Sequence, residues 1–252
     1  MLNVVVPMAG RGSRFADAGY DLPKPLIPVH GVPMTELVIG NIRPPRPHRF
    51  IFLCLREHLD RYGLAAHLRR WAPGCEVVPV DRVTAGAACT VLLAEDLIDS
   101  ADGLMIANCD QWVDVSIDAY LAVIGAADGL IMTMWADDPK WSFVRLGPAG
   151  RPCEVVEKRV VSNEATVGIY NFRHGRDFVA GAKRMIARDL RVNGEFYVAP
   201  VYNELLAGGA NLAIHNIGRD RAGMYGLGTP ADLEWFLAAD ISRKAVARAL
   251  AA

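Results

Sequence analysis

Residues 4–29 read VVVPMAGRGSRFADAGYDLPKPLIPV, and this stretch decides the fold that we expect for the chain. Its first residues, Val4–Val6, are a β-branched run that predicts a buried strand, and Pro7 is expected to end that strand. Gly10 and Gly12 follow closely. Because glycine has no Cβ atom, a loop with two glycines lets backbone amides approach a polyanion. The stretch therefore predicts a strand that leads directly into an anion-binding loop.

Two positively charged side chains, Arg14 and Lys24, lie near these glycines in the sequence. A strand followed by a glycine-rich, positively charged loop predicts a site for the phosphates of a nucleotide. Two standard phosphate-binding motifs are excluded. A P-loop ends in Gly-Lys-Ser/Thr, which this stretch lacks, and a dinucleotide-binding fingerprint needs a third glycine where this chain has Phe15.

The composition favours a globular α/β protein. The chain has 252 residues, 52% of them hydrophobic, which suits one large domain. A formal net charge of -1 gives no indication of a nucleic-acid-binding or membrane-binding surface, so we expect neither partner. The sequence has no signal-peptide pattern and no apolar run of transmembrane length. Its 5 cysteines lack Cys-x-x-Cys spacing, which favours reduced thiols in a cytoplasmic protein.

Strands and helices are predicted to alternate along the first half of the chain. This alternation favours a mixed, mostly parallel sheet with helices on both faces. Beyond residue 135, short strands separated by turns predict an antiparallel extension. A last helix is expected over about 231–250, with Thr229 as its N-cap and Pro230 at its first position. The further predicted strands are 49–55, 75–80, 103–107, 130–135, 143–146, 154–158, 166–172 and 212–217, and the further predicted helices are 34–41, 57–71, 86–97, 117–124, 176–188 and 197–207.

Three predicted loops lie at the carboxyl ends of strands, where ligands bind in open α/β sheets. They are the Gly10 loop, the segment Thr84-Ala85-Gly86 and the segment Asn108-Cys109-Asp110. Asp110 follows a buried strand, at a place where a carboxylate can meet bound phosphates. Because Mg²⁺ prefers one or two carboxylates together with phosphate oxygens and water, we predict Asp110 as a magnesium ligand. The alternative is an aspartate that caps the turn after the strand.

The pattern Gly10-x-Gly12-x-Arg14, followed by Pro23-Lys24-Pro25, resembles the signature of the sugar-phosphate nucleotidylyltransferases, or nucleoside-diphosphate-sugar pyrophosphorylases. The resemblance extends over nearly the whole chain and implies a Rossmann-like (GT-A-like) fold in one domain, residues 1–252. It divides the chain into a nucleotide-binding half at about 1–135, an acceptor-binding half at about 136–230 and a C-terminal helix at about 230–252.

The resemblance also implies the residues that bind the nucleotide. Arg14 and Lys24 are the expected catalytic cations, with Arg14 on the triphosphate and Lys24 on the α-phosphate or the incoming phosphate. Asp110 stands where the family carries its metal-binding aspartate. The expected nucleotide-binding residues are Ala9, Gly10, Gly12, Ser13, Thr84, Gly86 and Asn108.

One position departs from the resembled pattern. The family often carries a second acidic residue just before a Gly-Thr near the C-terminus, and here that position is Gly226. Asp220 and Asp232 are the candidates to replace it, and Asp110 with the pyrophosphate oxygens is the simpler arrangement.

The resemblance assigns the second substrate, the acceptor, to Glu157, Lys158, Gly168 and Glu195. In the family, the Glu-Lys pair binds sugar hydroxyls and phosphate, the glycine lies close to the sugar, and the late acidic residue belongs to a loop on the substrate side. The residues alone leave alternatives open: a solvated strand end at 157–158, a bulge at Gly168 and compensation of a helix N-terminus by Glu195. The segment 139–143 either lines the acceptor pocket or forms an exposed turn.

The implied reaction joins a nucleoside triphosphate (NTP) to a sugar 1-phosphate or related phosphomonoester and releases pyrophosphate, as in the synthesis of capsule or other surface polysaccharides. The base, the acceptor and a possible homo-oligomer stay open. Three alternatives remain: a CTP-dependent cytidylyltransferase for a non-sugar phosphate, a GT-A glycosyltransferase and a non-catalytic nucleotide-binding subunit. A GT-A glycosyltransferase usually carries Asp-x-Asp where this chain has Asn108-Cys109-Asp110.

Overall fold

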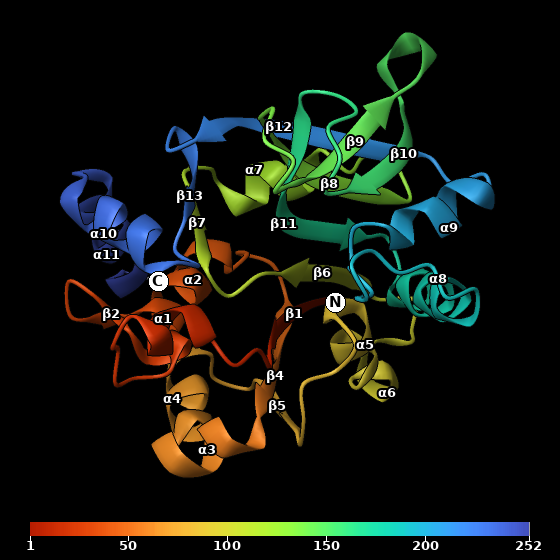
Figure 1. Ribbon diagram of the computed structural model, residues 1–252. Coiled ribbons are helices and arrows are strands. Elements are labelled where there is room, and N and C mark those ends of the chain that lie inside the picture. Colours follow the sequence, from red (N-terminus) through yellow and green to blue (C-terminus); the bar gives the residue numbers. More distant parts are fainter. Residues whose placement is uncertain (252) are drawn as a thin grey trace.

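In the computed structural model, which describes residues 1–251, strand β1 (Leu2–Met8) lies in the middle of a large sheet (Figure 1). It pairs in parallel with β4 (His48–Leu55) on one side and β6 (Gly103–Ala107) on the other. Strand β11 (Glu164–Phe172) then runs antiparallel to β6. The sheet continues with strands β5 (Glu76–Val80) beyond β4, and β8 (Gly129–Trp135), β12 (Leu212–Asp220), β13 (Gly223–Gly226) and β7 (Gln111–Val113) beyond β11.

A hairpin of β9 (Ser142–Leu146) and β10 (Pro152–Glu157) attaches to β11 and projects from the sheet at the top of Figure 1. It forms the expected antiparallel extension. A second, small hairpin pairs β2 (Pro28–Val29) with β3 (Val32–Pro33) just after the 3-10 turn η1 (Lys24–Leu26). A further 3-10 turn, η2 (Pro148–Gly150), connects β9 to β10.

Side chains of β1 alternate between two hydrophobic cores because successive residues of a strand point to opposite faces. Val4 and Val6 pack in a core with residues of α2 (Met34–Ile42), α4 (Leu64–Trp71) and α7 (Ile117–Ala122). Val5 packs on the other face with residues of α5 (Ala87–Leu92), α8 (Gly175–Ala187) and α9 (Val201–Ala207). The prediction of a mixed, mostly parallel α/β sheet with helices on both faces is confirmed. The remaining helices are α1 (Ser13–Asp17), α3 (Arg56–Tyr62), α6 (Glu95–Ile98), α10 (Pro230–Ala238) and α11 (Ile241–Leu250).

Several predicted boundaries are wrong for identifiable reasons. Pro7 does not end β1, which continues to Met8 and stays paired with β4 there. The pairing of β1 with β6 stops at Val5, so Pro7 has no partner strand on its β6 side, where a proline is tolerated. The predicted helix 57–71 is two helices, α3 and α4, because Gly63 adopts a left-handed conformation with φ 59°. The predicted helices 86–97 and 231–250 are likewise each divided in two, and the helix expected from Tyr197 begins at Val201.

Strands β7 and β13 are absent from the prediction, although they carry part of the site described below. They pair antiparallel, with Gln111 opposite Gly226 and Trp112 opposite Tyr225. Trp112 and Tyr225 belong to a third hydrophobic cluster that includes Phe15 of α1 and Phe236 of α10. This cluster packs the C-terminal helices against the N-terminal loop, as Figure 1 shows on its left side.

The last part of the chain begins as predicted. The Thr229 hydroxyl accepts a hydrogen bond from the backbone N–H of Asp232, and Pro230 is the first residue of α10, so the predicted N-cap is confirmed. Among residues 1–251, none of the helices has the length and apolar character needed to cross a membrane.

The contact between α2 and α11 gives a test of the packing. A Cβ atom on Gly40 would lie 2.8 Å from the Ala249 Cα atom, so the two helices approach each other over a bare backbone. We expect Gly40→Val to force the helices apart and to lower the free energy of unfolding by about 1–3 kcal/mol, the usual cost of overpacking. Urea denaturation measures this, with Ala247→Val on the exposed side of α11 as the control. Equal stability of both variants would contradict the packing described here.

Candidate functional site

The candidate site is organised by an ion pair between Lys24 in η1 and Asp110, which lies just after β6. The Lys24 Nζ atom donates to Asp110 Oδ2 at 2.8 Å, and the side chains of Lys24 and Asp110 are 21% and 27% exposed. Burial lowers the pKa of Lys24, but the neighbouring Asp110 carboxylate and Cys109 outweigh burial and raise that pKa above its ordinary value. Lys24 is therefore a permanent cation at this position.

The glycine-rich loop lies against this pair. Gly12 has a left-handed conformation with φ 64°, and its absent Cβ would stand 3.4 Å from the Cβ of Lys24. The backbone N–H groups of Phe15 and Ala16 donate to the Gly12 carbonyl and close the first turn of α1, which starts at Ser13. A cavity of about 220 Å³ borders the loop and is lined by Pro7, Met8, Gly10, Lys24, Pro25, Asn108, Cys109 and Asp110.

A second cavity, of about 420 Å³, also borders Asp110 and is lined by residues from both ends of the chain. Arg14 lines it together with Asp220, Asp232 and Gly226. Gly228 leaves space beside the carboxylate, because a Cβ there would lie 2.7 Å from Asp110 Oδ2. The Asp232 carboxylate stands 3.7 Å from the position of a Cβ on Gly226, and it accepts a hydrogen bond from the Thr229 hydroxyl at 2.7 Å.

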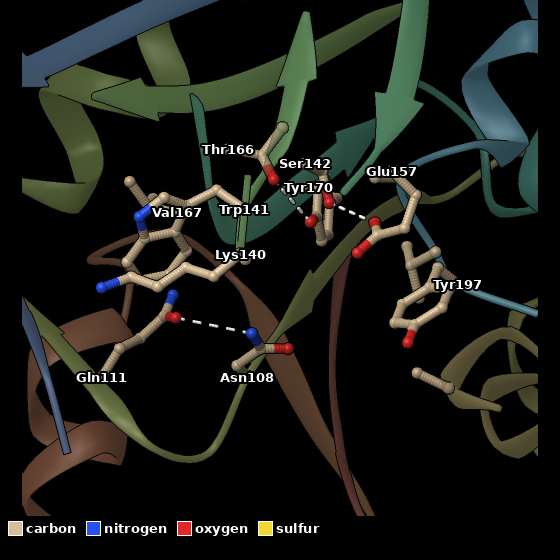
Figure 2. A pocket seen from close by; sticks show the side chains of 14 residues that line it. Asn108, Gln111, Lys140, Trp141, Ser142, Glu157, Thr166, Val167, Tyr170 and Tyr197 are labelled. Atoms are coloured by element: carbon tan, nitrogen blue, oxygen red, sulfur yellow. Dashed lines mark hydrogen bonds between the residues drawn. The ribbon is translucent and has the colours of Figure 1, made fainter. Parts of the chain in front are cut away.

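A third cavity, of about 190 Å³, is shown in Figure 2 and lies between β11 and the β9–β10 hairpin. Glu157 at the end of β10 accepts a hydrogen bond from the Ser142 hydroxyl, and the Thr166 and Tyr170 hydroxyls are 3.0 Å apart. Burial raises the pKa of Glu157 above its ordinary value of 4.5, while the Ser142 hydrogen bond and the charge of Lys158 oppose this rise. The cavity thus combines hydroxyl groups with one buried acid, Glu157, and one exposed cation, Lys140.

Lys158 and Glu195 lie close to this acid but are themselves exposed. The Lys158 Nζ atom donates to the Tyr197 hydroxyl at 2.8 Å, and Lys158 has a left-handed conformation with φ 54°. The hydrogen bond to Tyr197 raises the pKa of Lys158. Glu195 follows a tight turn in which it exchanges two backbone hydrogen bonds with Val192. Since α9 begins only at Val201, Glu195 does not lie at a helix N-terminus, and that alternative is wrong.

The Thr84–Gly86 loop packs against the neighbouring segment of chain. The Phe196 N–H donates to the Ala85 carbonyl at 2.8 Å, and a Cβ on Gly86 would collide with the Phe196 backbone. Thr84 donates its hydroxyl hydrogen to the Gly86 carbonyl at 2.9 Å. Gly86 therefore has a structural reason to be glycine, and the residue after it, Ala87, lines the third cavity.

The structure brings the three central predicted residues together: Arg14 and Asp110 line one cavity, and Lys24 contacts Asp110. Asn108 lines all three cavities. Gly168 lies at an irregularity of β11, and a Cβ on it would come within 2.9 Å of Gln111 Oε1. The register between β11 and β8 shifts across this position, and the nearest neighbours of the missing Cβ are the side chains of Asn108 and Gln111.

Several residues of these cavities were not predicted. Gln111 follows Asp110 directly and belongs to the unpredicted strand β7. Lys140 and Trp141 line both the second and the third cavity, and Pro139 and Lys140 also form an exposed turn, so both alternatives for segment 139–143 are present. Tyr197 and Tyr170 line the third cavity. Only the unusual Lys-Trp-Ser run gave a signal in the sequence; the others depend on strand pairing over long separations.

The surroundings of Asp110 fit a divalent cation. Its oxygens are hard donors, and the missing Cβ of Gly228 leaves room beside Oδ2. Residues 1–251 hold no group of three or more His, Cys, Asp or Glu side chains arranged around one ion position. A cation at Asp110 would thus need phosphate or water oxygens as its further ligands, which is the coordination that suits Mg²⁺.

Comparison with known proteins identifies the family and supports the fold. Residues 4–166 match the model of the MobA-like NTP transferase domain. The nucleoside-diphosphate-sugar pyrophosphorylase from Vibrio cholerae RC9 superimposes with a TM-score of 0.80 at 26% identity, over 93% of this chain and 99% of that one. The inositol-1-phosphate CTP transferase from T. maritima gives 0.73 at 15% identity (98% and 95%). The UDP-glucose pyrophosphorylase from Acinetobacter baumanii gives 0.70 at 16% identity (94% and 92%). A search of curated protein sequences found no match.

The chain belongs to the MobA-like NTP transferase family, because the matched segment covers more than half of its length. It is a nucleotidyltransferase of the nucleoside-diphosphate-sugar pyrophosphorylase type.

The raised pKa of Glu157 predicts a pH dependence of stability. The Glu157 carboxyl group binds its proton more tightly in the folded than in the unfolded protein. The free energy of unfolding therefore falls as pH rises from the unfolded pKa through the folded pKa of Glu157. Glu157→Gln removes this titration. We therefore expect the wild type to gain stability relative to the variant as pH is lowered from 8 through the carboxyl range, measured by urea denaturation at each pH. A constant difference between the two proteins across that range would contradict a raised pKa at Glu157.

Proposed function

We propose that this enzyme transfers a nucleotidyl group from an NTP to the phosphate of a sugar 1-phosphate or a related phosphomonoester and releases pyrophosphate. The observation that carries this proposal is the position of the Lys24–Asp110 pair between the loop cavity and the cavity of Arg14. A cation that binds phosphate and a carboxylate that binds metal then lie at the same point, where the two substrates would meet. The proposed assignment of residues 1–135 to the nucleotide and 136–230 to the acceptor stays a prediction.

In this mechanism an oxygen of the acceptor phosphate attacks the α-phosphorus of the NTP, and the bond from the α-phosphorus to the pyrophosphate oxygen breaks. The acceptor phosphate is already ionised near neutral pH, so the reaction needs no general base. Catalysis then consists of bringing two anions together and stabilising the added charge. Lys24 would contact the α-phosphate or the incoming phosphate, and Arg14 with the amides of Ala9, Gly10, Gly12 and Ser13 would hold the triphosphate.

Magnesium is part of the proposal. Asp110 would hold the ion, and the ion would supply positive charge to the leaving pyrophosphate. Asp232 is the better candidate for the second carboxylate, because it points to where a side chain on Gly226 would extend. Asp232 on α10 would then replace the metal-binding carboxylate that this chain lacks at Gly226 on β13.

The acceptor would occupy the cavity of Glu157. Its hydroxyl groups, its amides and its one buried acid suit a polyhydroxylated molecule. Lys140 at its wall and Lys158 next to Glu157 would repel an acceptor that carries a positive charge, such as a phosphorylated amino alcohol. Lys158 and Glu195 would contact the acceptor from the exposed rim, and Gly168, Thr84, Gly86 and Asn108 would shape the boundary with the nucleotide.

A substrate panel tests this function. The protein is incubated with Mg²⁺, each of CTP, UTP, dTTP, GTP and ATP, and a set of sugar 1-phosphates, inositol phosphates and phosphocholine, and pyrophosphate is measured. Pyrophosphate release that requires an NTP and a polyhydroxylated phosphate supports the proposal. Release with phosphocholine instead would identify a cytidylyltransferase of another acceptor class, and consumption of a sugar nucleotide without pyrophosphate would identify a glycosyltransferase.

Removal of either central charge should abolish most of the activity. We expect Lys24→Ala and Asp110→Asn each to lower kcat by on the order of 10²–10³, the usual loss for one preorganised electrostatic group. Thermal unfolding and circular dichroism should stay close to wild type, since both side chains are partly exposed. Near-normal turnover of Asp110→Asn would refute its assignment to the metal.

The second carboxylate has its own test, which needs no turnover. Mn²⁺ binding is measured by electron paramagnetic resonance in the presence of a non-hydrolysable NTP analogue. We expect Asp232→Asn to weaken Mn²⁺ binding about 10-fold, the lower range for loss of a metal-binding partner. Asp220→Asn is the matched control, because it removes another acid of the same cavity.

The reciprocal change should restore the site. A Cβ on Gly226 would make only ordinary contacts, at 3.7 Å or more, so Gly226→Asp can be accommodated in the Asp232→Asn protein. Recovery of Mn²⁺ affinity in this double variant would agree with Asp232 as a replacement ligand. Wild-type affinity of Asp232→Asn alone would reduce Asp232 to a residue of the α10 N-cap.

A further inference from the structure

Gln111 lies where the two substrate cavities meet. It lines the cavity that contains Glu157 and also the cavity that contains Arg14 and Asp110. Under the proposed function, the organic part of the acceptor occupies the first cavity and its phosphate extends into the second. The acceptor therefore has to pass the Gln111 side chain at the border between its phosphate and its organic part.

The fold fixes the orientation of this amide. The backbone of Gln111 is paired with Gly226 in the sheet, and its Oε1 atom accepts a hydrogen bond of 3.5 Å from Asn108 Nδ2, as Figure 2 shows. Gly168 makes room for both amides, because a Cβ there would overlap Asn108 and stand 2.9 Å from Gln111 Oε1. Gly168 reaches this position with a φ of 81°, a left-handed conformation that favours glycine, at an irregularity of β11.

The other end of the amide is buried and has free hydrogen-bonding capacity. Gln111 is only 7% exposed, and no acceptor within the described chain contacts its Nε2 atom. A buried donor without an acceptor is unfavourable, and such groups in folded proteins call for a specific explanation. The side chain lines both cavities, but this atom itself is shielded from solvent, so a bound molecule supplies the acceptor by displacing the side chains around it.

We propose that Gln111 is a specificity-determining residue whose Nε2 atom donates a hydrogen bond to an oxygen of the acceptor, next to the acceptor's phosphate group. In this role Asn108 and Gly168 are positioning residues: Asn108 fixes the oxygen end of the amide, and Gly168 leaves the space for the pair. Gln111 thus recognises an oxygen-bearing carbon skeleton beside the phosphate, and an acceptor with a methylene at that point would leave the donor unsatisfied.

Steady-state kinetics of Gln111→Met test this inference. Methionine has nearly the length of glutamine but no donor, so we expect KM for the acceptor to rise on the order of 10-fold, the effect of losing one hydrogen bond to a buried group. KM for the NTP and the thermal unfolding temperature should stay unchanged. Asn211→Met, which alters an exposed amide at the start of β12, is the matched control and should leave both KM values unchanged.

The outcomes separate this inference from the function on which it rests. If the wild type releases no acceptor-dependent pyrophosphate, the proposed function fails. If the wild type is active and Gln111→Met keeps the wild-type KM for the acceptor, only the role of Gln111 fails. A rise in both KM values together with a lower unfolding temperature would also overturn it, because that pattern indicates a purely structural residue.

A second comparison uses the substrate instead of the protein. A deoxy acceptor that lacks the oxygen next to its phosphate-bearing carbon should bind the wild type more weakly but should bind Gln111→Met about as well as the parent acceptor does. If the wild type and Gln111→Met discriminate between the two acceptors to the same degree, the proposed hydrogen bond is absent.

Discussion

The ion pair between Lys24 and Asp110 is the constraint on which the site depends. It joins two segments that are 86 residues apart, the turn after the glycine-rich loop and the end of β6. Both side chains are partly exposed, so water can still solvate either charge when its partner is removed, and the pair mainly orients the two groups. Each residue therefore holds the other in place. In the proposed reaction the two charges would part, with phosphate taking the lysine and a cation taking the aspartate, so the pair keeps both groups ready for opposite ligands.

Much of the fold could be predicted because the alternation of apolar strands and amphipathic helices is a local property of the sequence. Boundaries failed where one residue changes the backbone, as at Gly63, or where the neighbouring strand stops, as at Pro7. Strands β7 and β13 were missed for a different reason. They have 3 and 4 residues, and their pairing joins positions more than a hundred residues apart, so no local pattern reveals them.

The residues of the site likewise fall into those that the sequence could predict and those that it could not. Arg14, Lys24 and Asp110 could be found because they follow a motif near strand ends, and the structure brings them together. Gln111, Tyr170 and Tyr197 could not, since their position depends on β7, on the pairing of β11 and on the segment before α9. Gly168 was predicted from the family pattern, and the structure gives a local reason for a glycine at this position. The space left by its missing Cβ is next to Asn108 and Gln111, so Gly168 would affect a ligand through the positions of these two side chains.

The C-terminal helices are part of the site because of the third hydrophobic cluster. Trp112 of β7 packs against Tyr225 and Phe236, with ring centroids 5.7 and 6.3 Å apart, and this contact places α10 beside the cavity of Asp110. Asp232 on α10 can then stand next to Gly226 of β13. The match to the family model ends at residue 166, so this wall of the cavity lies outside it. A ligand that moves from a strand to an adjacent helix needs the helix held rigidly, and the aromatic cluster supplies that support. The packing of the last two helices thus sets the position of Asp232, the second carboxylate that we propose.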